Sequence, residues 1–257
     1  MKQYIVDTFA DKNFEGNPAA VCILEKWPDD LLLLNIAKEN NLSETAFISK
    51  ADCFKKLRWF TPGGEIELCG HATLATAFVL INYIDTTKEN VTFSTLSGDL
   101  IVTKKNGLFE MVFPAYDLKP VEIENKLTQA IGIKPKEVYL GRDLLCILES
   151  EQQVIDLDPD MDKVKELDGL LLQVTAQGSD VDCVSRTFAP KLNVDEDPVC
   201  GSGHCHIVPY WAEKLNKDSI IAYQASSRGG KLYTPFENSK VTLSGNVVLY
   251  AISDLYI

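Results

Sequence analysis

The chain has 257 residues, of which 46% are hydrophobic and 24% charged, as is typical of globular proteins. Its net charge of −12 argues against nucleic acid as a partner, because phosphate binding needs clustered lysines and arginines. No apolar run approaches the roughly 18–20 residues that span a bilayer, and we expect no membrane partner. The seven cysteines are an odd number scattered through apolar segments, which is unlike a secreted disulfide framework. No signal peptide is visible, so we expect a cytoplasmic protein.

Short apolar or alternating segments predict a chain rich in strands. In the first half we expect helices at Asp29–Glu39 and Ala72–Tyr83, and strands at Gln3–Phe9, Ala20–Leu24, Thr45–Ser49, Lys55–Phe60, Val91–Thr95, Asp99–Lys104 and Phe109–Phe113. In the second half we expect helices at Glu122–Ile131, from near Asp160 and after Gly203, and strands at Lys136–Leu140, Leu144–Leu148, Gly169–Thr175, Asp182–Phe188, Ile220–Gln224, Lys240–Ser244 and Val247–Ile252. This inventory predicts an α+β fold.

The two halves repeat one pattern. Residues 58–62 (RWFTP) precede Cys69-Gly70, residues 186–190 (RTFAP) precede Cys200-Gly201, and the two cysteines lie 131 positions apart. The helix at 72–83 is apolar nearly all round and should therefore be buried. We expect two pseudo-symmetric domains, residues 1–115 and 116–257, each a sheet rolled around a central helix, with Pro114–Pro120 as the linker.

Each Cys-Gly pair lies at the start of a helix, where unpaired N–H groups and the helix dipole favour a bound carboxylate. A thiol at such a place, Cys69 or Cys200, would have a depressed pKa. His71 lies at the first of these turns and is able to donate a proton near neutral pH. The other possibility is structural: His71 satisfies loop carbonyls while the Cys69 side chain packs.

The second turn follows a run of acidic residues. Pro198 holds Asp197 extended, and Ser202 is a natural N-cap. Glu44 stands at the entrance to an apolar strand, where a carboxylate suits a general base. We expect four glycines to let the backbone approach a substrate closely: Gly70, Gly201, Gly203 and Gly229. The structural alternative is a well-capped helix preceded by solvated acids.

Three further features have two interpretations each. Arg58 and Arg186 either bind a substrate carboxylate or stabilise their domains through hydrogen bonds. The segment 224–230 is either a turn that faces the ligand or a tight hairpin. A last group suggests metal ligands, but its spacing matches no common zinc pattern and we expect no metal there: Cys200, His204, Cys205 and His206.

Taken together, these segments closely resemble the PhzF-like family of phenazine biosynthesis, which shares its fold with diaminopimelate epimerase and proline racemase. The ordered matches are residues 7–9 (DTF), 16–21 (GNPAAV), 41–44 (NLSE), 69–73 (CGHAT), 186–190 (RTFAP), 196–198 (EDP) with 201–202 (GS), and 224–230 (QASSRGG). The resemblance implies a homodimer whose chains each hold a cofactor-free site between the two domains. It also implies that Glu44 moves a proton between carbons and that His71, Asp197 and Ser202 line the pocket.

The sequence departs from the family pattern in ways that leave alternatives open. Cys200 replaces a frequent Thr and Gly203 a frequent Ala, while Cys69 and Cys200 stand where diaminopimelate epimerase has its two catalytic thiols. His71 replaces the Asn of such epimerases. We therefore expect a cofactor-independent isomerase that acts on a small carboxylate-bearing substrate. The alternatives are a two-cysteine epimerase or racemase and a non-catalytic binding or scaffold protein.

Overall fold

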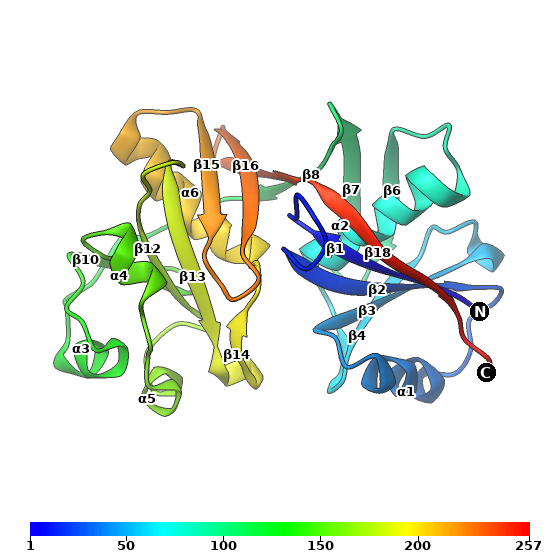
Figure 1. Ribbon diagram of the computed structural model, residues 1–257, viewed down its shortest axis with the longest axis horizontal. Helices are drawn as coiled ribbons and strands as arrows, with labels where there is room; N and C mark the ends of the chain where they lie inside the picture. The colour runs from blue at the N-terminus through cyan, green and yellow to red at the C-terminus, as the bar shows by residue number, and fades with distance from the viewer. The chain divides into compact units, whose positions relative to one another are not determined.

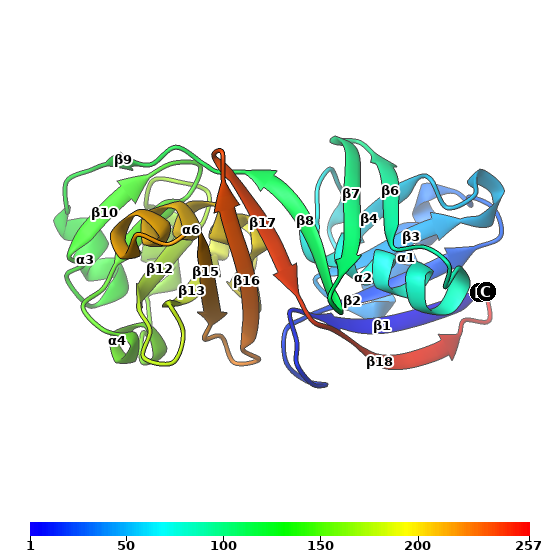
Figure 2. The ribbon, with the colours of Figure 1, turned by 90° about the horizontal axis from the view of Figure 1, so that it is seen from above.

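The computed structural model describes residues 1–257 and divides the chain into two compact units. Unit 1 contains Met1–Met111 and Ser244–Ile257, and unit 2 contains Val112–Leu243. The C-terminal residues therefore belong with the first half of the chain and not with 116–257. The reason is that strand β18 (Val247–Asp254) pairs antiparallel along strand β1 (Lys2–Thr8), beside which it lies in Figure 2.

Unit 1 contains a six-stranded sheet in the order β18-β1-β2-β3-β4-β5 and a meander of three further strands (Figure 1). Its remaining elements are β2 (Asn17–Leu24), α1 (Asp30–Asn40), β3 (Glu44–Ser49), η1 (Lys50–Asp52), β4 (Leu57–Thr61), β5 (Gly64–Ile66), α2 (Gly70–Val79), the π-helical turn η2 (Leu80–Ile84), β6 (Asn90–Thr95), β7 (Gly98–Lys105) and β8 (Leu108–Pro114), which leads into unit 2. A two-residue hairpin turn joins β7 and β8, and the positive φ angles at Asn106 and Gly107 suit its length.

Helix α2 lies at the centre of unit 1, as its apolar sequence predicts. It packs against β1, β2, β3, β7 and β18. Its two threonines are buried, and Thr73 and Thr76 donate their hydroxyls to the carbonyls of Cys69 and Ala72. Because these hydroxyls find partners within the helix, both threonines are buried in α2 without unsatisfied donors.

Unit 2 contains one sheet in the order β17-β16-β15-β13-β12-β11-β10-β9, with β14 paired to β13. Its elements are β9 (Lys119–Pro120), α3 (Asn125–Ile131), β10 (Glu137–Leu140), β11 (Leu144–Ile147), α4 (Glu151–Ile155), α5 (Met161–Lys165), β12 (Leu172–Gln177), β13 (Cys183–Ala189), η3 (Pro190–Leu192), β14 (Val194–Asp197), α6 (Gly201–Leu215), β15 (Ser219–Gln224), β16 (Gly230–Glu237) and β17 (Lys240–Gly245), which leads back to unit 1. The linker segment is thus partly extended strand.

Helix α6 has the same place in unit 2 that α2 has in unit 1. It packs against β12, β15 and β16, and nine of its residues are buried. Its first residue, Gly201, lies 131 positions after Gly70, the first residue of α2. The α+β prediction, with a buried helix packed against strands in each unit, is confirmed. No helix combines the length and apolar character that a membrane crossing requires.

Candidate functional site

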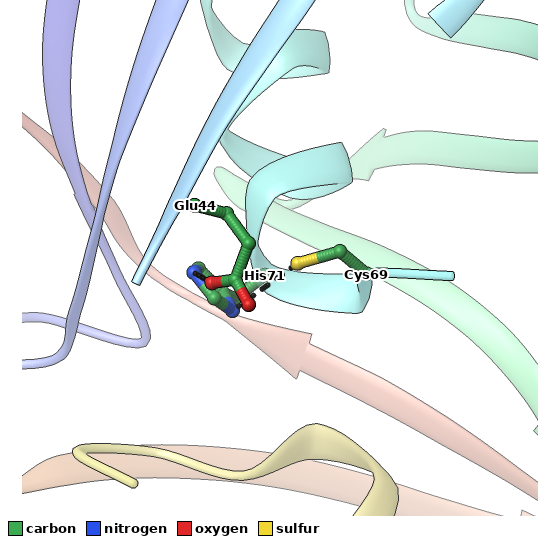
Figure 3. Close-up of side chains that lie close together, drawn as sticks. All are labelled: Glu44, Cys69 and His71. Atoms are coloured by element: carbon green, nitrogen blue, oxygen red, sulfur yellow. Dashed lines mark hydrogen bonds and ion pairs between the residues drawn. The ribbon is translucent and has the colours of Figure 1, made fainter. Parts of the chain in front are cut away.

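The start of α2 brings three predicted residues together (Figure 3). Glu44 is the first residue of β3, Cys69 is the N-cap of α2, and His71 lies in the first turn of the helix. Nε2 of His71 lies 3.1 Å from Oε2 of Glu44, and Nδ1 of His71 lies 3.6 Å from Sγ of Cys69. Gly70, the first residue of α2, separates the cysteine from the histidine. The imidazole therefore bridges a carboxylate and a thiol.

These side chains are largely shielded from water. The side chain of His71 is 9% exposed and that of Glu44 is 16% exposed. The facing atoms, Oε2 of Glu44 and Nε2 of His71, are themselves buried, and their contact lacks the geometry of a hydrogen bond. The two groups thus form an ion pair and keep hydrogen-bonding capacity for another molecule.

The ionisation of His71 follows from these neighbours. Burial opposes the charged imidazole, but the Cys69 sulfur and the Glu44 carboxylate favour it, and the pKa of His71 is raised well above 6.5. For Cys69, burial raises the pKa of the thiol and Glu44 raises it further, against the opposing effect of His71. These neighbours therefore favour an imidazolium at His71, and burial favours a protonated thiol at Cys69.

The same three side chains each offer one possible metal-ligand atom, and these atoms lie within 4.8 Å of one another. The two partners of His71 lie at different ring nitrogens, Glu44 at Nε2 and Cys69 at Nδ1. A tetrahedral ion bonded to one nitrogen would need both other ligands on that side of the ring. The arrangement therefore suits proton transfer between hydrogen-bonding groups and does not fit a metal.

The start of α6 is built differently. The N-cap is Cys200, whose Sγ accepts a hydrogen bond of 3.3 Å from the N–H of Gly203, so the expectation that Ser202 caps the helix was wrong. Ser202 is the second residue of the helix, and its Oγ accepts a hydrogen bond of 2.9 Å from Nη2 of Arg142. The hydroxyl therefore does not cap the helix and is instead hydrogen-bonded to the guanidinium of Arg142.

Asp197 and the 224–230 segment are tied to this helix start. The carboxylate of Asp197 accepts from the N–H of Val199 at 3.1 Å. The buried side chain of Gln224 donates to the carbonyl of Asp197 at 2.6 Å and accepts from the N–H of Cys200 at 2.9 Å. Ser226 donates to the carbonyl of Pro198 at 2.7 Å. The segment therefore fixes the backbone that carries Asp197.

Two of the predicted glycines are explained by packing. A Cβ on Gly203 would lie 2.5 Å from Oε1 of Gln173, and a Cβ on Gly229, which has a φ of +66°, would lie 2.2 Å from Oη of Tyr223. A side chain at either position would collide with its own unit. For Gly201 the nearest atom is Cδ1 of Leu243, at 3.1 Å.

The expectation of a depressed thiol pKa was wrong at both helix starts. Burial raises the pKa of Cys200, as it does that of Cys69, and Asp197 raises it further. Desolvation of the thiolate outweighs the stabilisation that the helix terminus supplies. Both thiols are therefore neutral at physiological pH.

The structure assembles the predicted residues in two groups, one at each helix start. Unit 1 brings together Glu44, Cys69, Gly70 and His71, and unit 2 brings together Asp197, Cys200, Gly201, Ser202 and Gly203, with Gly229 in the segment that Gln224 and Ser226 attach to them. The metal interpretation of the α6 cysteines and histidines has no geometric support, because only the Glu44 group places three ligand atoms together.

The two arginines of the repeated motif have structural partners. Arg58 donates two hydrogen bonds of 2.6 Å to Glu65 and one of 2.8 Å to Asp30. Arg186 donates two to Glu196, at 2.7 and 3.0 Å, and one to the carbonyl of Leu157. These contacts favour the domain-stabilising alternative over carboxylate binding.

Sequence reasoning missed Arg142, Asp143 and Gln173, which lie behind Ser202. Residues 142 and 143 occupy the short connection between β10 and β11, and Asp143 and Gln173 are fully buried. In the sequence, an Arg-Asp pair between two short apolar strands has the pattern of a solvated hairpin turn. No signal distinguishes it from one, because its burial depends on α6, some 60 residues later.

Comparison with known proteins gives concordant matches. The family model for phenazine biosynthesis-like proteins, PhzC-PhzF, matches residues 6–252. An uncharacterized isomerase of Pseudomonas aeruginosa is 44% identical over 252 residues, which are 98% of this chain and 97% of that protein. A crystal structure of a PhzF-family protein from Enterococcus faecalis has a TM-score of 0.96 at 48% identity and covers 100% of this chain and 99% of its own. A probable proline racemase from Agrobacterium radiobacter, at 11% identity and a TM-score of 0.66, covers 100% of this chain and 93% of its own and shares the fold alone.

Proposed function

The chain belongs to the phenazine biosynthesis-like PhzC-PhzF family and is an isomerase of that family, and on this basis we propose that it moves a proton on a small carboxylate-bearing substrate without a cofactor. Glu44 is the group that takes the proton from one carbon and returns it to another. A shift of this kind needs one base that both accepts and donates, and a carboxylate in a water-poor site is able to do so.

The observation that supports this role best is the buried pair of Glu44 and His71. The carboxylate oxygen that faces the imidazole is shielded from water and has no hydrogen bond of its own. The raised pKa of His71 keeps a positive charge next to it. Once Glu44 has taken a proton, the imidazolium is a donor for the negative charge that forms on the substrate.

The other predicted residues supply binding. We assign the substrate carboxylate to the N–H groups at a helix start, where Gly70 and Gly201 are the first helical residues. Asp197 and Ser202 are assigned polar contacts with the substrate, Ser202 as a hydroxyl donor. The small-molecule partner, the cytoplasmic location and the homodimer are further parts of the proposal, and light scattering of the purified protein tests the dimer.

The test is deuterium exchange. The protein is incubated in D₂O with a panel of cyclic dienes, amino acids and hydroxy acids that carry a carboxylate, and NMR detects deuterium at one carbon. We expect Glu44→Gln to lower the exchange rate by about 10²- to 10⁴-fold, the usual contribution of a general acid–base group. Glu65→Gln is the matched control, since Glu65 is an acid of the same unit that pairs with Arg58, and its exchange rate should stay close to that of the wild type.

The alternatives give different results. If Glu44→Gln retains exchange while Cys69→Ser or Cys200→Ser abolishes it, the protein is a two-cysteine epimerase or racemase and the proposal is wrong. The raised pKa values of both thiols argue against that outcome, because a thiolate is the form that abstracts a proton. If no member of the panel exchanges but some bind, the protein is a binding or scaffold protein.

A further inference from the structure

We propose that Arg142 is a positioning residue that sets the Ser202 hydroxyl as a hydrogen-bond donor toward the substrate. Since Ser202 belongs to the site of the proposed function, this role rests on that function. Arg142 comes from the β10–β11 connection and does not itself need to touch the substrate.

The direction of the hydrogen bond carries the inference. Nη2 of Arg142 lies 2.9 Å from Oγ of Ser202, and a guanidinium only donates. Oγ is therefore the acceptor in that bond, and its single hydrogen must point elsewhere. The other neighbour of the hydroxyl is Sγ of Cys200, 3.4 Å away, which is a weak acceptor. An oxygen of a bound substrate would be a better one.

A buried chain of polar groups holds Arg142 in this orientation. Its Nε and Nη2 donate to the two oxygens of Asp143 at 2.8 and 2.7 Å. Oδ2 of Asp143 accepts from Nε2 of Gln173 at 3.1 Å, and Oε1 of Gln173 accepts from the hydroxyl of Thr187 at 2.5 Å. Asp143, Gln173 and Thr187 are fully buried. Each side chain from Arg142 to Thr187 is hydrogen-bonded to the next, and these bonds hold the guanidinium in place beside Ser202.

A second set of contacts holds the backbone of Ser202. The N–H of Asp143 donates to Nε2 of His206 at 3.2 Å, which makes that nitrogen an acceptor and the ring neutral. Burial lowers the pKa of His206 accordingly. Nδ1 of the ring then carries the hydrogen and faces the carbonyl of Ser202 at 3.3 Å. Tyr116 stacks on the His206 ring, with centroids 4.2 Å apart, and lies beneath the guanidinium of Arg142.

Packing alone does not require this network. A buried ion pair contributes little net stability, and apolar side chains of similar volume often fill such a space as well or better. The network instead ends on one hydroxyl at the start of α6, on the turn that carries Cys200 and Ser202. Its effect is to aim that hydroxyl and to place a positive charge behind it.

The structural test needs no substrate. Crystal structures of the wild type, Arg142→Met and Arg142→Lys are compared, with Arg186→Met as control, because Arg186 also makes a bidentate pair in unit 2 but does not contact Ser202. We expect the Ser202 hydroxyl to leave its position in Arg142→Met and to keep it in Arg186→Met. Arg142→Lys keeps a donor and should retain the position in part. If Ser202 stays in place in both Arg142 variants, Arg142 does not position it and the inference is wrong.

The functional test is a double-mutant cycle in the deuterium-exchange assay. Loss of one donor to a developing negative charge lowers rates by about 10²- to 10³-fold, and we expect Ser202→Ala to fall in this range. If Arg142 acts through Ser202, Arg142→Met lowers the rate in the wild type but not further in Ser202→Ala. Additive losses would contradict the positioning role. The Glu44→Gln variant separates the two proposals. If it retains exchange, the proposed function is wrong. If it is inactive but the rate losses of Arg142→Met and Ser202→Ala are additive, only the role of Arg142 is wrong.

Discussion

The starts of α2 and α6 carry the same Cys-Gly turn, yet the charged side chains beside them differ: Glu44 and His71 at α2, Arg142 and Asp143 at α6. At α2, Glu44 and His71 face each other and keep hydrogen-bonding capacity, and the pKa of His71 is raised. At α6, Arg142 and Asp143 form a bidentate ion pair. Hydrogen bonds from Gln173 to Asp143 and from Thr187 to Gln173 continue this network into the interior. One helix start holds a carboxylate and an imidazole that face each other, and the other holds a fixed charge behind a hydroxyl.

The difference teaches that a repeated turn marks the fold and not the chemistry. Both turns put a cysteine at the N-cap of a buried helix. The chemistry comes from the strands and connections that pack beside each turn, which supply Glu44 in unit 1 and Arg142 with Asp143 in unit 2. The following predictions test this contrast, from the largest effect to the smallest.

Removing the acid at each helix start should affect stability very unequally. Asp143→Asn leaves the guanidinium of Arg142, whose side chain is 30% exposed, without its counter-ion, and the cost should not exceed the loss of about 3–5 kcal/mol that breaking a fully buried pair causes. Glu44→Gln should cost far less, because His71 is able to lose its proton whereas arginine is not. Urea unfolding of both variants measures the difference. Equal losses would show that the two pairs are alike.

Adding one methyl group inside α6 should disturb the fixed-charge network. The Cβ of Gly203→Ala would meet Gln173, which is held by Asp143 and Thr187, and overpacking of this kind costs about 1–3 kcal/mol. Gly201→Ala is the control, since it brings a similar gain in helix propensity but meets only the end of Leu243. The difference between the two unfolding free energies isolates the packing effect. A Gly203→Ala protein as stable as Gly201→Ala would show that Gln173 is free to move.

The chain has three histidines, and NMR titration should separate them by helix. The pKa of His71 should lie well above 6.5, burial should lower that of His204 to about 4, and that of His206 should also be lowered. Glu44→Gln should lower the pKa of His71, because burial then opposes the charge with less compensation, and leave the other two unchanged. A His71 that titrates below 6.5 in the wild type would remove the ion pair from the site.

The pH dependence of stability should carry opposite signs for the two helices. His71 has a raised pKa in the folded state, so its contribution is complete below pH 6.5 and is lost as the pH rises through the folded value. His204 and His206 have lowered values, so their contribution is present above pH 6.5 and is lost as the pH falls toward about 4. Urea unfolding of the wild type and of His71→Asn across this range should show the alkaline loss only in the wild type.

Much of the fold could be predicted because it depends on local patterns. The apolar run at 72–83 forms the buried helix α2, which begins two residues earlier and ends at Val79, and most of the π-helical turn η2 that follows. Asp29 caps α1 through its side chain, 2.8 Å from the N–H of Leu32. The strands β5, β9, β14 and β16 and the helix α4 were not anticipated. Most of these are short and have too few residues for a period to be visible.

The candidate site could be predicted where its residues lie in recognisable motifs. The Cys69-Gly70-His71 turn and Glu44 are such cases, and their side chains do meet. The depressed thiol pKa was wrong because the burial of Cys69 and Cys200 depends on segments far away in the chain. The capping role of Ser202 was wrong because α6 begins at Gly201, which makes Cys200 the N-cap.

The sequence by itself determined the α+β class, the two buried helices with their Cys-Gly starts, and the family to which the chain belongs. These follow from short motifs and from the order of apolar and polar residues, which are local. Only the tertiary structure decided that β18 closes the sheet of unit 1, that both thiols are neutral, and that Arg142 with Asp143 lies behind Ser202. Burial and pairing of charges depend on which distant strands and helices pack together, and no local pattern encodes that.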